Sequence, residues 1–207
     1  MSRFAAEVRL ILAFVCPACI GALAVIYAST GGGAWGRRSA IGWMMGSWGA
    51  RLTVQALYAC RSEGVGDRRL LTSSFRLLAF AVFFSLPALI ASRNSDPSLS
   101  TIELVACALW LAAFAGETTA DRQLLRFTSK PENAGLVCRN GVWRYSRNAH
   151  ALFETLIWIA FALFASASPW GWIAFACPAA TAWMIVRRVE GPLCYPPMAF
   201  VTTGHDS

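Results

Sequence analysis

Six long apolar runs constrain the fold of this chain more than any other feature. They cover roughly residues 10–29, 40–60, 75–92, 101–116, 150–167 and 170–186. Each run has, or nearly has, the roughly 20 residues that a helix needs to cross a bilayer. Backbone polar groups in lipid must be satisfied within the segment itself, so these runs are expected to be helices. We therefore predict an all-α, polytopic membrane helix bundle with about six transmembrane helices.

The composition excludes the main alternatives to a membrane protein. Hydrophobic residues make up 57% of the chain and charged residues only 14%, whereas soluble domains carry about 25% charged residues. Disordered chains do not tolerate this apolar content. With 207 residues, the chain has the length of a single domain, so we expect residues 1–207 to form one integral-membrane unit.

The distribution of cations predicts the orientation in the membrane. Fourteen of the 18 Lys and Arg residues lie in or beside the two termini and the long connections 61–74 and 117–149. Only Arg37, Arg38 and Arg93 lie on the other side, and Arg51 lies within a run. By the positive-inside rule, the termini and both long connections are expected in the cytoplasm. This also explains the net charge of +7 without a nucleic-acid partner, and we expect none.

Cysteine and histidine give no clear metal or redox motif. The pair Cys16-Pro-Ala-Cys19 has C-x-x-C spacing, but no second pair or nearby histidine completes a metal site. Buried cysteine usually behaves as a small hydrophobic residue, so we interpret this segment as part of a kinked helix. His150 and His205 are the only histidines, and we expect no metal site.

Two charges within the apolar runs are candidates for function, because intramembrane charges are costly. Arg51 lies on one helical face with Ser47, Gln55 and Tyr58, at spacings of i, i+4, i+8 and i+11. Glu154 lies near the cytoplasmic start of the fifth run, at a similar depth. We therefore predict an Arg51–Glu154 ion pair. A purely structural pair between helices is an open alternative.

The segment before the fifth run combines cations with aromatic side chains. Guanidinium groups bind phosphates in bidentate fashion, and rings stack on bases. Arg147, His150 and Glu154 follow one another at i, i+3 and i+7, so they share a helix face. This pattern predicts a site for an anionic, aromatic ligand. Anchoring of the helices to lipid headgroups is the alternative.

Three motifs in this order resemble the steroid 5-alpha reductase family, in particular its small bacterial members. The first is Trp48-x2-Arg51-Leu52, followed by Arg61 and Gly66-Asp67-Arg68. The second is Glu117-x3-Asp121-x-Gln123-x3-Phe127, and the third is Gly141-Val-Trp143-Arg144-Tyr145-Ser146-Arg147-x6-Glu154. The resemblance covers residues 47–191 and leaves 192–207 as a divergent short tail.

The resemblance implies a helix bundle whose cytoplasmic half binds NADPH. Hydride would pass to an activated carbon–carbon double bond in a steroid or other hydrophobic lipid substrate lying among the membrane lipids. It also implies a multi-pass protein of the bacterial inner membrane. Transferred by position, the cofactor-binding residues would be Arg51, Arg61, Asp121, Arg139, Arg144, Tyr145, Arg147, Asn148, His150 and Glu154.

Departures from the family pattern leave two alternatives open. Arg147-Asn-Ala-His150-Ala stands where the family has R-H-P-N-Y, and Trp48 stands near the position of a tyrosine that helps polarise the substrate in eukaryotic relatives. One alternative is a methyltransferase of the isoprenylcysteine type that uses S-adenosylmethionine, although its R-H-P core is missing here. The other is a non-catalytic member of the reductase family that keeps the scaffold.

Overall fold

The computed structural model describes residues 3–63, 80–133, 136–146 and 148–189, and the side chains of 17–54, 80–133, 136–146 and 148–186. These parts are helical and contain no strand. The α-helices are α1 (Arg3–Thr30), α2 (Trp35–Glu63), α4 (Leu86–Ala91), α5 (Thr101–Thr128), α6 (Ala149–Ser166) and α7 (Ala176–Val189). Three 3-10 turns accompany them: η1 (Pro131–Asn133), η2 (Gly141–Arg144) and η3 (Gly171–Phe175). The predicted all-α class is confirmed.

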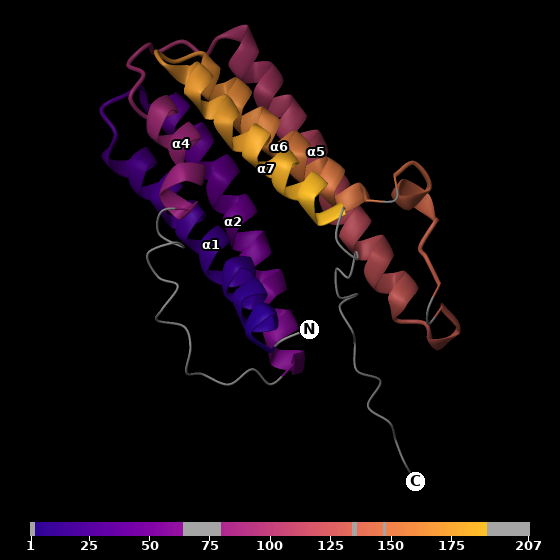
Figure 1. Cartoon of the computed structure of the whole chain (residues 1–207). Coiled ribbons are helices and arrows are strands. Elements are labelled where there is room, and N and C mark those ends of the chain that lie inside the picture. Colours follow the sequence, from indigo (N-terminus) through magenta and orange to yellow (C-terminus); the bar gives the residue numbers. More distant parts are fainter. Residues whose placement is uncertain (1–2, 64–79, 134–135, 147, 190–207) are drawn as a thin grey trace.

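The helices run side by side in an elongated bundle (Figure 1). α1 packs along α2, and α5 packs along α6. α4 contacts both α2 and α6, and α7 contacts α6. Glycine allows the first pair to approach closely, because a Cβ on Gly49 would lie 2.6 Å from the Pro17 carbonyl oxygen and 3.0 Å from Cα of Gly21. Contact between backbones therefore replaces contact between side chains at this crossing.

Two helices, α5 and α6, are long and apolar enough to span a membrane. Two shorter apolar helical stretches, Pro17–Thr30 and Gly171–Val186, accompany them. The outer surfaces of α5 and α6 carry exposed apolar side chains, among them Leu104, Val105, Leu111 and Leu152. Exposed apolar surface of this kind is typical of a helix that faces another apolar phase rather than water.

The sequence predicts one continuous helix for the third apolar run. The described part of this run, residues 80–92, is instead interrupted. The chain is helical over 80–84, turns at Ser85 and continues as α4. Pro87 lies at the start of α4, where it has no N–H to donate to the preceding turn. The Ser85 hydroxyl donates to the Val82 carbonyl oxygen over 2.8 Å. Residues 75–79 of this run lie outside the described residues.

The sixth run also differs from the prediction of a single helix. Trp170 has a φ of 63°, a left-handed conformation that ends the preceding turn, and η3 separates it from α7. α7 has 14 residues, which at 1.5 Å per residue is about 21 Å. This is shorter than the roughly 30 Å of a bilayer's hydrocarbon core.

The short connections are held together at one end of the bundle, the upper end in Figure 1. The backbone N–H of Gly33 donates to the Ser92 carbonyl over 2.9 Å, and that of Ala34 donates to Asn94 over 2.9 Å. The Asn94 side chain in turn donates to the Ala167 carbonyl over 3.1 Å. Three connections that are distant in sequence therefore lie together, and the described parts of the longer connection between α5 and α6, residues 129–133 and 136–146, lie at the other end.

A buried ion pair lies at this upper end. Arg37 is 2% exposed and Glu103 is 0% exposed. Besides its ion pair with Glu103, the guanidinium donates to the carbonyl oxygens of Asp96 over 2.6 Å and Ser98 over 2.7 Å. α2 begins at Trp35, five residues before the predicted start, so Arg37 lies on the helix and its side chain reaches Glu103.

The loop before α5 is ordered by short-range hydrogen bonds. The Ser98 backbone N–H and hydroxyl both donate to the Asp96 carboxylate, and these bonds hold the pKa of Asp96 below its ordinary value. Ser100 donates its backbone N–H to the Glu103 carboxylate over 2.7 Å, as in one half of a capping box. The start of α5 and the buried ion pair are therefore built from the same residues.

Candidate functional site

Five charged or titratable side chains from three helices meet inside the bundle. This charged cluster consists of Arg51 on α2, Glu117 and Asp121 on α5, and His150 and Glu154 on α6. Each of the pairs on α5 and α6 is spaced i, i+4, which places its members on one helix face. Glu117 is 0% exposed, and Arg51 is 12% exposed. The cluster is therefore largely removed from solvent.

Arg51 contacts two carboxylates of α5. Its Nη2 forms an ion pair with Glu117, and its Nη1 lies 3.1 Å from Oδ2 of Asp121. The Cζ atom of Arg51 lies 5.1 Å from the centroid of the Phe114 ring, within reach of a cation–π interaction. Two carboxylates one turn apart thus hold the guanidinium against α5.

The predicted Arg51–Glu154 ion pair is wrong. Among the described contacts of Arg51, the acidic partners are Glu117 and Asp121. Oε1 of Glu154 instead accepts a hydrogen bond of 2.9 Å from Nε1 of Trp158, one turn along the same helix. The prediction failed because it matched the two charges by depth alone and did not consider Glu117 and Asp121, which both contact Arg51.

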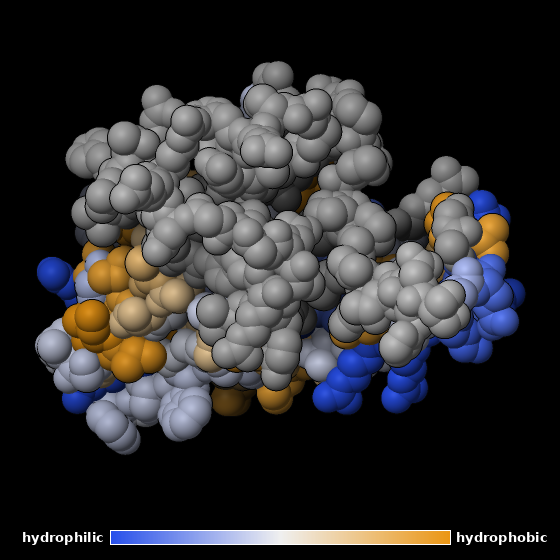
Figure 2. Space-filling view, turned by 90° about the horizontal axis from the view of Figure 1, so that it is seen from below, coloured by the Kyte–Doolittle hydropathy of each residue, from blue (hydrophilic) through white to orange (hydrophobic). Residues whose placement is uncertain are grey.

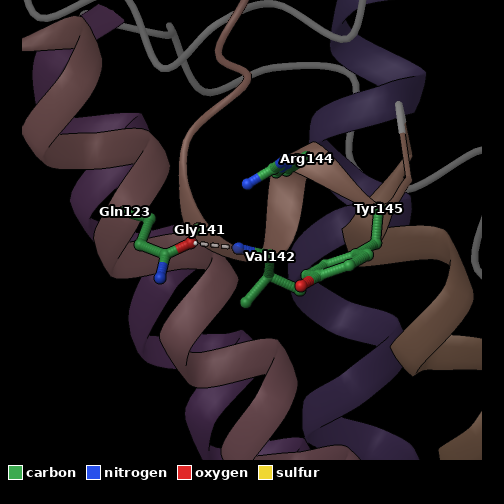
Figure 3. A pocket seen from close by; sticks show the side chains of 5 residues that line it. All are labelled: Gln123, Gly141, Val142, Arg144 and Tyr145. Atoms are coloured by element: carbon green, nitrogen blue, oxygen red, sulfur yellow. Dashed lines mark hydrogen bonds between the residues drawn. The ribbon is translucent and has the colours of Figure 1, made fainter.

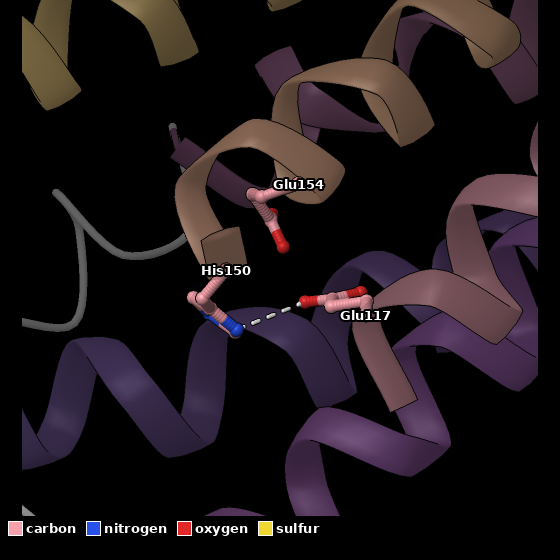
Figure 4. A group of neighbouring side chains, drawn as sticks. All are labelled: Glu117, His150 and Glu154. Atoms are coloured by element: carbon pink, nitrogen blue, oxygen red, sulfur yellow. Dashed lines mark ion pairs between the residues drawn. The ribbon is translucent and has the colours of Figure 1, made fainter. Parts of the chain in front are cut away.

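His150 connects the α5 carboxylates to α6 (Figure 4). Its Nδ1 lies 3.4 Å from Oε1 of Glu117 and 3.3 Å from Oδ1 of Asp121. Glu154 points into the same space from the next turn of α6. The predicted common face of His150 and Glu154 is thus present.

Aromatic packing closes the inner side of the charged cluster. Trp158 packs against Trp48 with ring centroids 5.1 Å apart and against Phe84 at 4.6 Å. Trp48 and Trp158 are each 2% exposed. Because these rings exclude water on that side, electrostatic interactions in the cluster act in a medium of low effective dielectric constant.

A second feature is an open pocket of about 460 Å³ beside the end of α5. Figure 3 shows its lining residues, which are Gln123, Gly141, Val142, Arg144 and Tyr145. Arg144 and Tyr145 are exposed, and Tyr145 shows 87% of its surface. The pocket therefore combines a cation, an aromatic ring and an amide at the surface.

Hydrogen bonds to α5 fix the turn η2 that carries this pocket. Oε1 of Gln123 accepts from the Val142 backbone N–H over 2.9 Å, and Nε1 of Trp143 donates to the Ala120 carbonyl over 2.9 Å. Gly141 has a φ of +60°, and a Cβ there would lie 2.4 Å from the Gln123 side chain. Only glycine fits this turn without strain.

The remaining predicted site residues are not brought into the charged cluster. Arg139 is exposed on the segment before η2, and Asn148 is exposed at the start of α6, where its backbone N–H donates to Oγ of Ser146 over 3.2 Å. The remaining predicted residues lie outside the side chains that the structure describes. They are Arg61, Arg147, and Gln55 and Tyr58 from the predicted polar face around Arg51.

Sequence reasoning missed three participants in these features. Glu117, Gln123 and Trp158 were not among the predicted site residues. The first two belong to the motif on α5, and the i, i+4 spacing of Glu117 and Asp121 was a usable signal. Trp158 follows Glu154 by four residues, so its indole N–H was in reach of that carboxylate.

The surface near the pocket is hydrophilic. Viewed from the lower end, the largest group of described hydrophilic residues lies along the right edge in Figure 2, where Figure 1 places the end of α5 and the segment after it. Exposed cations in this part of the chain are Arg122, Arg126, Lys130, Arg139 and Arg144. This edge is suited to anionic partners.

Comparison with known proteins gives one match. The family model described as "Protein of unknown function (DUF1295)" matches residues 5–194. No curated protein and no solved structure matches the chain.

Proposed function

This chain belongs to the DUF1295 family, and we propose that it is a membrane-embedded, NADPH-dependent reductase of an activated carbon–carbon double bond. Its substrate would be a steroid or another hydrophobic lipid carrying an enone. The observation that carries the proposal is the convergence of Arg51, Asp121, His150 and Glu154, all half-buried, around the fully buried Glu117. These residues come from the three motifs that resemble steroid 5-alpha reductases.

The order of the three motifs along the chain does not require their side chains to meet. That they do meet therefore supports the resemblance. Arg51 and Asp121 are 70 residues apart in sequence, and Asp121 and His150 are 29 apart. A chance similarity in three short segments gives no reason for their side chains to touch. A shared ligand site does give such a reason, since ligand contacts are assembled from several elements.

The polar groups fit the two chemically different ends of NADPH. The exposed guanidiniums of Arg139 and Arg144 suit the phosphates, and the Tyr145 ring beside Arg144 offers a surface for the adenine. The charged cluster is rich in carboxylates, which repel phosphates but accept hydrogen bonds from ribose hydroxyls and a carboxamide. Asp121, His150 and Glu154 would therefore line the inner, reactive end.

In such a site the cofactor supplies the hydride, while the chain orients the reactants. Arg51 holds Asp121 in place through the 3.1 Å contact, so the carboxylate presents a fixed acceptor. The rings of Trp48, Trp158 and Phe84 exclude water from the inner side. Exclusion of water favours transfer of hydride to the substrate.

We also propose that the lower end of the bundle in Figure 1 faces the cytoplasm and that the chain crosses the inner membrane of a bacterium several times. Cysteine labelling in intact cells tests the orientation. Cys138 is a poor probe because it is 6% exposed, so Glu132→Cys, at a site 74% exposed, is the better one. We expect no reaction with an impermeant maleimide until the membrane is opened. Reaction in intact cells would contradict the orientation.

Titration of purified protein with NADPH tests the proposed cofactor site. Arg144→Ala is expected to weaken NADPH binding roughly ten- to hundredfold, because one charge-assisted hydrogen bond contributes about 1.5–3 kcal/mol. Arg126→Ala is the matched control, since Arg126 is an exposed arginine on α5 that does not line the pocket. Equal affinities of the two variants would contradict the assignment and favour headgroup anchoring.

A further inference from the structure

We propose that Glu117, His150 and Glu154 form a binding site for one divalent transition-metal ion, with Zn²⁺ as the best match. One ligand atom from each of these side chains lies within 4.8 Å of the other two. The three side chains point toward one another from α5 and α6 (Figure 4). The sequence analysis predicts no metal site, because the chain contains only two histidines.

The separations suit a metal ion. Nδ1 of His150 lies 3.4 Å from Oε1 of Glu117. Two ligands bound at about 2.1 Å in a tetrahedral site are about 3.4 Å apart, so this edge already has the required length. Glu154 needs to approach by up to about 1.4 Å, which a change in the rotamer of its side chain can provide.

Buried oxygens without hydrogen-bond donors provide independent support. Oε2 of Glu154 is buried and accepts no hydrogen bond from the described residues, and Oε1 of Glu117 is buried with the long 3.4 Å contact to Nδ1 of His150 as its contact among them. Glu117 is 0% exposed. Buried acceptors normally have a partner, and a cation bound between these two oxygens would supply it.

With His150 neutral, a divalent ion would balance the charge of the described cluster. The described cluster holds three carboxylates, from Glu117, Asp121 and Glu154, against the single permanent cation Arg51. A neutral imidazole leaves a net charge of −2, which a divalent ion neutralises. Buried charge of this size is costly without compensation.

The outer contacts of the ligands resemble those of known metal sites. Arg51 forms an ion pair with Oε2 of Glu117, and Trp158 donates to Oε1 of Glu154. Such contacts orient ligating carboxylates and leave their other oxygens for the metal. One imidazole nitrogen with two carboxylates favours Zn²⁺ over Mg²⁺, which prefers oxygen ligands and retains water.

Three protein ligands leave a fourth position open on a tetrahedral ion. This consequence rests on the proposed function: an ion there would polarise the carbonyl oxygen of an enone as a Lewis acid. His150 and Glu154 would then contact the reactants through the ion, and direct contacts to the dinucleotide would fall to Asp121 and the surface residues.

Metal binding to the chelator-treated, full-length protein in detergent tests the site in the absence of nucleotide. We expect one equivalent of Zn²⁺ per chain by elemental analysis, and no displacement by millimolar Mg²⁺. Glu154→Gln keeps an oxygen that accepts from Trp158, and His150→Gln is the second variant. In competition with a chromogenic chelator, each substitution should weaken Zn²⁺ binding at least about 100-fold. Loss of a residue that only orients a ligand weakens metal binding by up to about 100-fold, so loss of a ligand itself should cost at least as much.

Glu132→Gln is the matched control, because it makes the same chemical change at an exposed glutamate, and its Zn²⁺ affinity should equal that of the wild type. Unchanged melting temperature and elution volume show that the variants are folded. Substoichiometric binding, or wild-type affinity in Glu154→Gln as cysteine-bound zinc would give, overturns the inference. NADPH binding to protein that binds no zinc would refute the metal site and leave the proposed function intact. Zinc binding without NADPH binding would refute the proposed function and leave the metal site intact.

Discussion

Replacing Arg37 with leucine is expected to lower the free energy of unfolding by about 3–5 kcal/mol. The substitution leaves Glu103, which is 0% exposed, as a buried charge without its guanidinium. It also removes the donors to the Asp96 and Ser98 carbonyl oxygens. For a chain of this length we expect the melting temperature in detergent to fall by roughly 10 °C.

Two further variants separate the ion pair from other effects. Arg37→Leu combined with Glu103→Leu should lose less stability than the two single losses added together, because no buried charge is left unpaired. Arg93→Leu makes the same change at an exposed arginine of the same end and should alter stability by no more than about 0.5 kcal/mol. Strict additivity of the Arg37 and Glu103 losses would contradict the pair.

Replacing Arg51 with leucine is expected to have a similarly large effect, about 3–5 kcal/mol. The guanidinium contacts both Glu117 and Asp121, so its loss leaves carboxylates facing one another in a buried space. Thermal unfolding of the purified variant in detergent measures the loss.

A pair of double-mutant cycles identifies the partner. Arg51→Leu should couple to Glu117→Leu by about 1.5 kcal/mol or more, as residues in one ion-pair network do. Coupling to Glu154→Leu should be clearly smaller, because Glu154 accepts from Trp158 instead. The reverse order would restore the pairing of Arg51 with Glu154 and contradict the structure.

Helix positions were predictable where the apolar pattern was regular. The fourth run begins at residue 101, as α5 does, and the helix continues past the end of the run to Thr128. The break at Ser85 and the left-handed Trp170 were not foreseen. Hydropathy measures only how apolar a segment is, and a short turn among apolar residues leaves that average unchanged.

The members of the site were easier to predict than their partners. Arg51 and Glu154 were identified because charges in apolar runs are costly. Their pairing was wrong, since partner choice depends on how helices face one another. The 3.1 Å contact of Arg51 with Asp121 follows from the packing of α2 near α5. That packing is set by side-chain shape along the whole helix, which spacing within one helix does not encode.

Nucleotide binding to the purified wild-type protein tests the central claim most directly. Titrations with NADPH, NADH and S-adenosylmethionine under one set of conditions compare the three ligands. The account predicts saturable NADPH binding, roughly ten- to hundredfold weaker NADH binding because the ribose phosphate is missing, and no saturable binding of S-adenosylmethionine. Equal affinity for NADH and NADPH, or tight binding of S-adenosylmethionine, would contradict it.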